Sequence, residues 1–200
     1  MSDRLSHTDV LFTQRLLRMQ GLYDGAPDGV WGPRTQAAAL EFERRSLILR
    51  AELGEFDPRS ERHILGLTLI AQAEARRFMA RVSGHGVDVR IISGTRSYAE
   101  QNLLFRQGRY GNPGPVVTHA SGGRSRHNFG IAWDIGVFTA EAGYSRHPRD
   151  YAEVARLGLS DALQWGGDWP RFPDPPHYEL DLRIDLAALR ERFERGEPAV

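Results

Sequence analysis

The sequence predicts an α+β fold, in which a small antiparallel sheet is flanked by helices and preceded by an N-terminal helical unit. Residues 8–20 and 35–45 are predicted to be helical, whereas short strands are predicted over the alternating, β-branched segment 87–93 and over 131–137 and 177–182. Helical segments separate these strands without a regular strand–helix repeat, which would instead favour a parallel sheet. We therefore expect short strands that pair antiparallel.

The N-terminal segment predicts two helices joined by an ordered loop. Residues 8–20 carry apolar residues at roughly helical spacing, Thr8 or Asp9 can cap the N-terminus, and Gly21 ends the helix. Residues 23–35 are dense in turn-forming residues. A second helix is expected over residues 35–45.

A domain boundary is expected within residues 55–62, which are polar and contain Pro58. The predicted domains are a helical unit over residues 1–52 and a larger domain over residues 57–190. The elements expected in the larger domain are a helix over 62–81, a strand over 87–93, a helix over 97–107, a loop over 108–123, a strand over 131–137, a helix over 151–163 and a strand over 177–182.

The composition excludes several classes of chemistry. The chain has no cysteine, so disulfides, thiolate metal ligands and a cysteine nucleophile are excluded, and any metal must be bound by His, Asp or Glu. The 26 basic residues, all of them arginine, balance 26 acidic ones. No net charge attracts nucleic acid, and we expect no nucleic-acid partner.

The N-terminus lacks the basic and then apolar stretch of a secretory signal, and no run of eighteen apolar residues occurs. We therefore expect synthesis in the cytoplasm without a signal peptide and no membrane insertion, so that action outside the cell requires release or delivery. A monomer is expected.

Two histidines and a carboxylate form a candidate metal site. Catalytic zinc takes about three imidazole or carboxylate ligands and keeps one position open, and His127, Asp134 and His177 are of these types. Gly130 permits a tight turn between the first two ligands, and Ala132 leaves room beside the ion. Taken singly, each ligand is more often a packed histidine or a turn cap, but their conjunction favours a site.

Asp174 is the candidate general base. A zinc ion would lower the pKa of its bound water to about 7, and a base must then accept the proton. Asp174 lies three residues before His177, and the two prolines between them restrict the backbone. Trp165 and Trp169, set among glycines, are candidates for the wall of a substrate groove, whereas Trp133 is expected in the core.

The pattern Ser125-x-His127-x-x-Gly130-x-Ala132-x-Asp134 resembles the metal motif of the zinc D,D-peptidase and L-alanyl-D-glutamate endopeptidase family, which shares its fold with the Hedgehog signalling domain. Further matches are Ser93-Gly94-Thr95-Arg96-Ser97 with Gln101, Tyr110-Gly111, Trp165-Gly166-Gly167-Asp168-Trp169 and His177-Tyr178-Glu179. The resemblance covers residues 57 to 182.

This resemblance implies roles for individual residues. His127, Asp134 and His177 become the ligands of one zinc ion, and Asp174 becomes the catalytic base. Arg96 binds the substrate or the oxyanion of the tetrahedral intermediate, a task suited to a fixed positive charge; the alternative is that Arg96 only anchors the loop after its strand. Ser125 helps to hold the peptide, and Trp165 is a further candidate for substrate binding.

The N-terminal unit resembles the first half of a three-helix peptidoglycan-binding domain. The pattern consists of Gln14, Leu17, Gly21 and Tyr23, then Asp28-Gly29-Val30-Trp31-Gly32-Pro33-Arg34-Thr35 with Ala38 and Phe42. The second half, with another Asp-Gly turn and a closing helix, is not evident in residues 46–57, so the unit is either truncated or borrows its third helix. Asp28 and Trp31 are the candidate wall-binding residues, and a plain helical hairpin is the alternative.

Together these features predict a zinc-dependent, endolysin-like peptidoglycan hydrolase whose partner is the stem peptide of the cell wall. An aspartate at position 174, preceded by the Trp165–Trp169 run, resembles phage endolysins and related enzymes that cut between L-Ala and D-Glu. The dipeptidases of vancomycin resistance carry glutamate as the base. The alternatives are a D,D-carboxypeptidase acting on D-Ala-D-Ala, or a wall-binding protein with the same fold and no catalysis.

Overall fold

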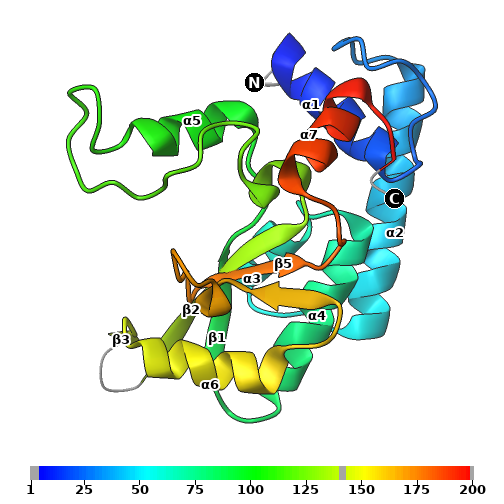
Figure 1. The fold of residues 1–200 in the computed structure, drawn as a ribbon. Coiled ribbons are helices and arrows are strands. Elements are labelled where there is room, and N and C mark those ends of the chain that lie inside the picture. Colours follow the sequence, from blue (N-terminus) through cyan, green and yellow to red (C-terminus); the bar gives the residue numbers. More distant parts are fainter. Residues whose placement is uncertain (1–4, 140–142, 199–200) are drawn as a thin grey trace. The chain divides into compact units, whose positions relative to one another are not determined.

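The computed structural model (Figure 1) describes residues 5–139 and 143–198. The chain divides into two compact units. Unit 1 comprises residues 1–45, 96–129 and 184–200, and unit 2 comprises residues 46–95 and 130–183. The helices are α1 (His7–Met19), α2 (Pro33–Leu53), α3 (Pro58–Ile64), α4 (Leu69–Ser83), α5 (Tyr98–Arg106), α6 (Pro148–Gly158), α7 (Leu186–Arg195) and the 3-10 helices η1 (Arg126–Phe129) and η2 (Gly166–Asp168). The strands are β1 (Asp88–Ser93), β2 (Ala132–Thr139), β3 (Gly143–Tyr144), β4 (Leu163–Trp165) and β5 (His177–Leu180).

Unit 2 is built around a five-stranded sheet in the order β1-β2-β5-β4, with β3 paired to β2 (Figure 1). Every strand pair is antiparallel. Helix α3 packs against β1, and α4 packs against β1, β5 and α6. The predicted α+β class, with a small antiparallel sheet flanked by helices, is confirmed.

The two faces of the β2–β5 pair have different roles. Trp133 and Tyr178 are opposite each other across the two strands, both are fully buried, and the Phe78 ring of α4 lies 4.6 Å from that of Tyr178. Because alternate side chains of a strand point to opposite faces, the neighbouring pair Asp134 and His177 points away from this aromatic core. The sheet therefore presents that pair on its other face.

Unit 1 is held by an aromatic cluster contributed by four separate segments. Phe12 of α1 and Phe129 of η1 contact Phe193 of α7 edge to face, with ring centroids 5.6 and 5.2 Å apart. Tyr98 at the start of α5 contacts Phe129 in the same way at 6.4 Å. Such contacts bury large apolar area and fix the place of η1 within the unit.

Three predicted helices have different bounds in the structure. The helix expected over 35–45 extends to Leu53, because residues 46–53 contain no Gly or Pro and Gly54 is the first residue that stops it. Residues 46–53 therefore continue α2. The helix expected over 62–81 is two helices, since Thr68 caps α4 and its amide donates to Gly130 O at 2.8 Å. The helix expected over 151–163 ends at Gly158, where the Phe78 ring leaves no room for a side chain.

Among the described residues, β3, β4, α7 and the two 3-10 helices were not predicted. β4 is only three residues long and is stabilised by pairing with β5, a tertiary contact that local sequence does not show. α7 had ordinary helix signals that the prediction missed: Asp185 accepts bonds from the amides of Ala187 and Ala188, and Gly196 ends the helix in a left-handed conformation. The domain limits 1–52 and 57–190 stay a prediction.

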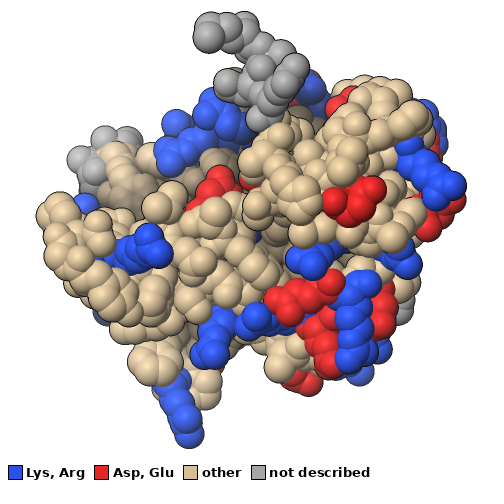
Figure 2. Space-filling view, turned by 90° about the horizontal axis from the view of Figure 1, so that it is seen from above, with Lys and Arg blue, Asp and Glu red and all other residues tan. Residues whose placement is uncertain are grey.

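The surface carries charge of both signs, and Figure 2 shows basic and acidic side chains next to one another on the face viewed. Ion pairs form between neighbours on one helix, as Glu41 does with Arg44 and Arg45 in α2. Across residues 5–139 and 143–198, every helix is too short or too polar to span a membrane.

Candidate zinc site and active site

The structure brings together the three predicted metal ligands. His127, Asp134 and His177 each offer one ligand atom, and these atoms lie within 4.8 Å of one another. Both histidines are buried and Asp134 is half-buried. Two imidazoles and one carboxylate form the donor set that catalytic zinc sites use.

The sheet register positions Asp134 and His177. The two residues are direct partners across β2 and β5, and His177 Nδ1 lies 3.2 Å from Asp134 Oδ1. Two ligands at about 2.0–2.1 Å from a tetrahedral ion are about 3.3 Å apart. This pair therefore fits a zinc ion, which would be bound through Nδ1 of His177 and a carboxylate oxygen of Asp134.

The Glu179 carboxylate forms a hydrogen bond with His177 Nε2, the ring nitrogen that does not face Asp134. Its Oε2 lies 2.9 Å from His177 Nε2, and both side chains are only 7% exposed. Burial alone would lower the pKa of His177, but hydrogen bonds and charge attraction from Asp134 and Glu179 raise it to about 9. When a metal takes Nδ1, a carboxylate on Nε2 fixes the tautomer and the ring orientation. Sequence reasoning gave Glu179 no role, although its i+2 spacing from His177 on a strand places both on one face.

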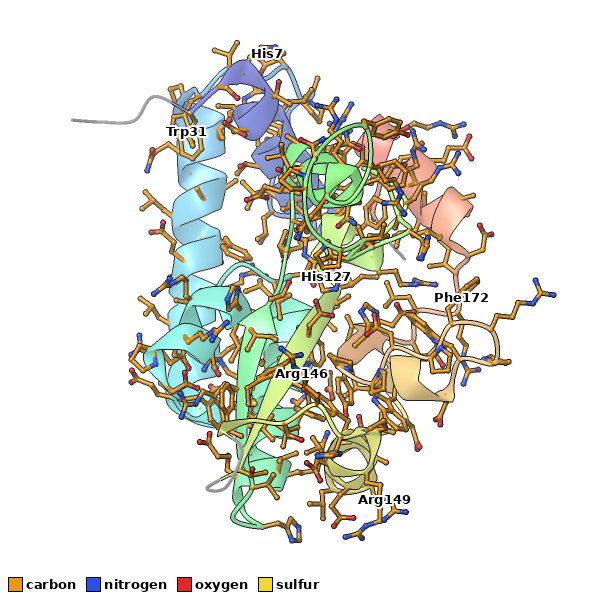
Figure 3. All side chains as sticks on the ribbon, turned by 90° about the vertical axis from the view of Figure 1, so that its left-hand side faces the viewer. His7, Trp31, His127, Arg146, Arg149 and Phe172 are labelled. Atoms are coloured by element: carbon orange, nitrogen blue, oxygen red, sulfur yellow. The ribbon has the colours of Figure 1, made fainter. Side chains whose placement is uncertain are left out.

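The third predicted ligand, His127, lies in η1, directly before the chain enters β2 (Figure 3). The carbonyl of His127 accepts a 3.0 Å bond from the amide of Arg96, and the Asn128 side chain donates to the Arg96 carbonyl at 2.9 Å. Asn128 also accepts from Gly123 N and is fully buried. The backbone of Arg96 is thus fixed to the segment that carries His127, and the predicted residue Ser125 begins the same turn, where its carbonyl accepts from Asn128 N.

Asp174 lies in a turn that leads into β5. Its carbonyl accepts from His177 N at 3.0 Å, and its amide donates to Gly166 O at 2.8 Å. A Cβ at Gly166 would lie 2.6 Å from Asp174 O and 3.0 Å from His177 Cβ, so only glycine permits this close approach. The exposed Asp174 therefore lies in the turn directly before the predicted ligand His177, and its role as the base stays a prediction.

The two candidate groove tryptophans both contact this turn. Trp165 Nε1 donates to the Pro175 carbonyl at 2.7 Å, which attaches the indole to the turn between Asp174 and His177. The Trp169 ring lies 5.0 Å from the His177 ring. Both indoles are half-buried, so each supports the turn while keeping some surface exposed. Trp133 lies in the core, as expected.

The candidate wall-binding residues lie in the loop between α1 and α2. Asp28 Oδ1 accepts from Gln14 Nε2 and from Val30 N, both at 2.9 Å, while Gln14 Oε1 accepts from the amides of Asp28 and Gly29. Gln14 is fully buried, so Asp28 organises its own loop. Trp31 is 41% exposed, and Figure 3 shows it near the start of α2.

Comparison with known proteins supports the site. Residues 118–180 match a family of the M15 peptidases described as D-alanyl-D-alanine carboxypeptidase, and this range contains all three predicted ligands and Asp174. Peptidoglycan L-alanyl-D-glutamate endopeptidase CwlK of Bacillus subtilis is 36% identical over 120 residues, which cover 56% of this chain and 71% of CwlK.

Two solved structures are also similar to this chain. The L-Ala D-Glu endopeptidase ChiX of Serratia marcescens superposes with a TM-score of 0.50 at 27% identity, covering 64% of this chain and 90% of ChiX. The vancomycin resistance D,D-pentapeptidase VanY, solved as a point mutant in complex with Zn(II), gives a TM-score of 0.43 at 15% identity, covering 66% of this chain and 81% of VanY.

The small antiparallel sheet and the cluster of two histidines and a carboxylate define a zinc metallopeptidase. The chain belongs to the M15 peptidase family, whose members depend on zinc.

Proposed function

We propose that this peptidase is a peptidoglycan hydrolase that cleaves the stem peptide between L-Ala and D-Glu. The observation that carries the proposal is the 36% identity to CwlK, which is named for this activity and matches the chain over 120 residues. The turn that contains Asp174 supports it, because main-chain bonds to Gly166 and His177 keep this aspartate in the turn that leads to the proposed ligand His177.

In this proposal His127, Asp134 and His177 hold one zinc ion. The ion supplies Lewis acidity, which polarises the scissile carbonyl and makes water a better nucleophile at neutral pH. Asp174 accepts the proton of the attacking water and delivers it to the leaving amine of D-Glu. Arg96 stabilises the negative charge that develops on the carbonyl oxygen.

Ser125 and Trp165 complete the proposed substrate site. Ser125 is half-buried and lies two residues before His127, where its hydroxyl can bond to the peptide backbone. Trp165 is held by Pro175 beside the catalytic turn and offers an aromatic surface to the substrate.

The test is digestion of purified sacculi followed by mass analysis of the muropeptides. The proposal expects peptides that begin with D-Glu and glycan strands that keep only L-Ala. Chelation should abolish the release, and added zinc should restore it. Free D-Ala as the main product would establish the D,D-carboxypeptidase activity that the matched family's description favours. Binding to sacculi without any released amine would establish a non-catalytic protein.

We further propose that the loop between α1 and α2 binds the cell wall through Trp31. Its indole is exposed, with Nε1 donating to Gln36 at 2.9 Å, and Asp28 holds the loop that carries it. Trp31→Ala should weaken co-sedimentation with sacculi. Phe172→Ala is the matched control, since Phe172 is 73% exposed but lies in unit 2. Equal loss in both variants, or in neither, would contradict this role.

The peptidase is expected to reach the wall by release or delivery after cytoplasmic synthesis, and to act as a monomer. Both points stay predictions.

A further inference from the structure

Gln101 is a fully buried polar side chain in α5, and its amide lies between Arg96 and the long loop that follows the helix. Its Nε2 donates to the Ala120 carbonyl at 2.8 Å and to Thr118 Oγ1 at 3.4 Å. Its Oε1 accepts from Arg96 Nη1 at 3.3 Å. A single amide thus contacts both the guanidinium and the end of the loop.

The direction of this amide is determined by its two neighbours. A backbone carbonyl can only accept and a guanidinium can only donate. The Gln101 NH2 group must therefore face Ala120, and its oxygen must face Arg96. A flipped amide would oppose donor to donor and acceptor to acceptor, so the bond to Ala120 fixes an acceptor on the side of the guanidinium.

The backbone of Arg96 is fixed separately from its side chain. His127 O and the Asn128 side chain bond to the main-chain atoms of Arg96, so these two bonds do not orient its guanidinium. A charged group that stabilises a transition state must be oriented before the reaction, because small displacements lower the rate by large factors. Gln101 supplies a fixed hydrogen-bond acceptor that can orient the Arg96 guanidinium.

We infer that Gln101 is a positioning residue that helps to orient the Arg96 guanidinium for catalysis. This inference rests on the proposed function, in which Arg96 stabilises the carbonyl oxygen. The alternative is that Gln101 only anchors the loop. That loop has a second anchor at the same place, because Arg109 Nη1 donates to the carbonyls of Phe105 and Thr118 at 2.6 and 3.0 Å.

The experiment is a double-mutant cycle in the full chain. The substitution Gln101→Met keeps the length of the side chain and removes its three hydrogen bonds, and it is made in the wild type and in Arg96→Ala. The readouts are kcat and KM on a soluble stem peptide, zinc content and Tm. Gln72→Met is the matched control, since Gln72 is also fully buried and bonds to backbone carbonyls, those of Leu65 and Leu67 in unit 2.

We expect Gln101→Met to lower kcat by about tenfold in the wild type, with KM and zinc content kept, and to have no further effect in Arg96→Ala. Gln72→Met should lower Tm without any coupling to Arg96. The same loss from Gln101→Met in both backgrounds would overturn the inference while Arg96 keeps its role. Full activity of Arg96→Ala would overturn the role of Arg96, and the inference with it.

Discussion

Two turns of this molecule each place an exposed aspartate beside a proline, and they use it in different ways. In the loop of unit 1, the Asp28 carboxylate itself accepts the bonds from Gln14 and Val30 that hold the loop together. In the turn of unit 2, the amide and the carbonyl of Asp174 make the bonds that shape the turn. The first aspartate builds its turn with its side chain, whereas the second is held in its turn by main-chain atoms.

Asp28 therefore has a structural role in its loop, whereas Asp174 is available for a chemical role. A side chain that holds its own loop is constrained to that task, and its loss affects the loop. A side chain whose turn is built by the backbone can be replaced without dismantling the turn. The two aspartates should therefore respond in opposite ways to substitution.

The largest expected effect is that of Asp174→Asn. Removing a general base lowers kcat by about 10²–10⁴-fold. Because the backbone bonds of the turn remain, Tm should stay within about 2 °C of wild type and zinc content should not change. Hydrolysis assays with calorimetry and metal analysis check this. A variant that is inactive because it has lost zinc or unfolded would contradict the separation of roles.

The second-largest effect is expected at Glu179, whose carboxylate lies 2.9 Å from His177 Nε2. Glu179→Gln keeps the shape but removes the charge that favours the metal-binding tautomer of His177. Zinc affinity should fall about 10–100-fold, as measured by competition with a chromophoric chelator. Glu191→Gln, on the exposed side of α7, is the control and should bind zinc like the wild type. An unchanged zinc affinity in Glu179→Gln would show that Glu179 does not contribute to zinc binding.

A smaller loss is expected from Gly166→Ala, which leaves every functional side chain in place. The added Cβ would lie 2.6 Å from Asp174 O, so the turn must shift, and kcat should fall about tenfold with zinc still bound. Gly32→Ala is the matched control, because a Cβ there has no atom within 4 Å. Equal kinetics in the two variants would mean that the turn tolerates displacement.

The smallest effect on catalysis is expected at Asp28. Asp28→Ala should lower Tm by a few degrees and leave the hydrolysis of a soluble stem peptide unchanged. The hydrogen bond from Gln14, then that from Val30 N, lowers the pKa of Asp28. A lowered pKa means that the charged form stabilises the fold above the unfolded value of about 3.9, and that this contribution is lost as pH falls through the folded pKa.

Wild-type Tm should consequently fall more steeply below pH 4 than that of Asp28→Asn, which keeps the acceptor oxygen and does not titrate. Thermal melts between pH 3 and pH 6 check this prediction. Parallel pH profiles for the two proteins would show that Asp28 does not hold the loop.

The sequence predicted the class of fold and the identity of the metal cluster, because strand alternation and ligand type are local properties. His127, Asp134 and His177 were selected as residue types that bind zinc. Asp174 was selected from its spacing to His177, and its role stays a prediction. The bond of Glu179 to His177, the contact of Gly166 with Asp174 and the place of Gln101 beside Arg96 depend on which segments meet in space. Helix limits failed for the same reason, since the break before α4 is stabilised by Gly130 from a distant part of the chain.

Asp134 and His177 are paired across β2 and β5, so metal binding by these two residues depends on the register of the two strands. A slip of one residue between these strands would turn one ligand toward the Trp133–Tyr178 side of the sheet and separate the donors. An ion that binds only the correct register stabilises that register by mass action, in proportion to the logarithm of its free concentration. Zinc binding should therefore also stabilise the observed β2–β5 register relative to registers shifted by one residue.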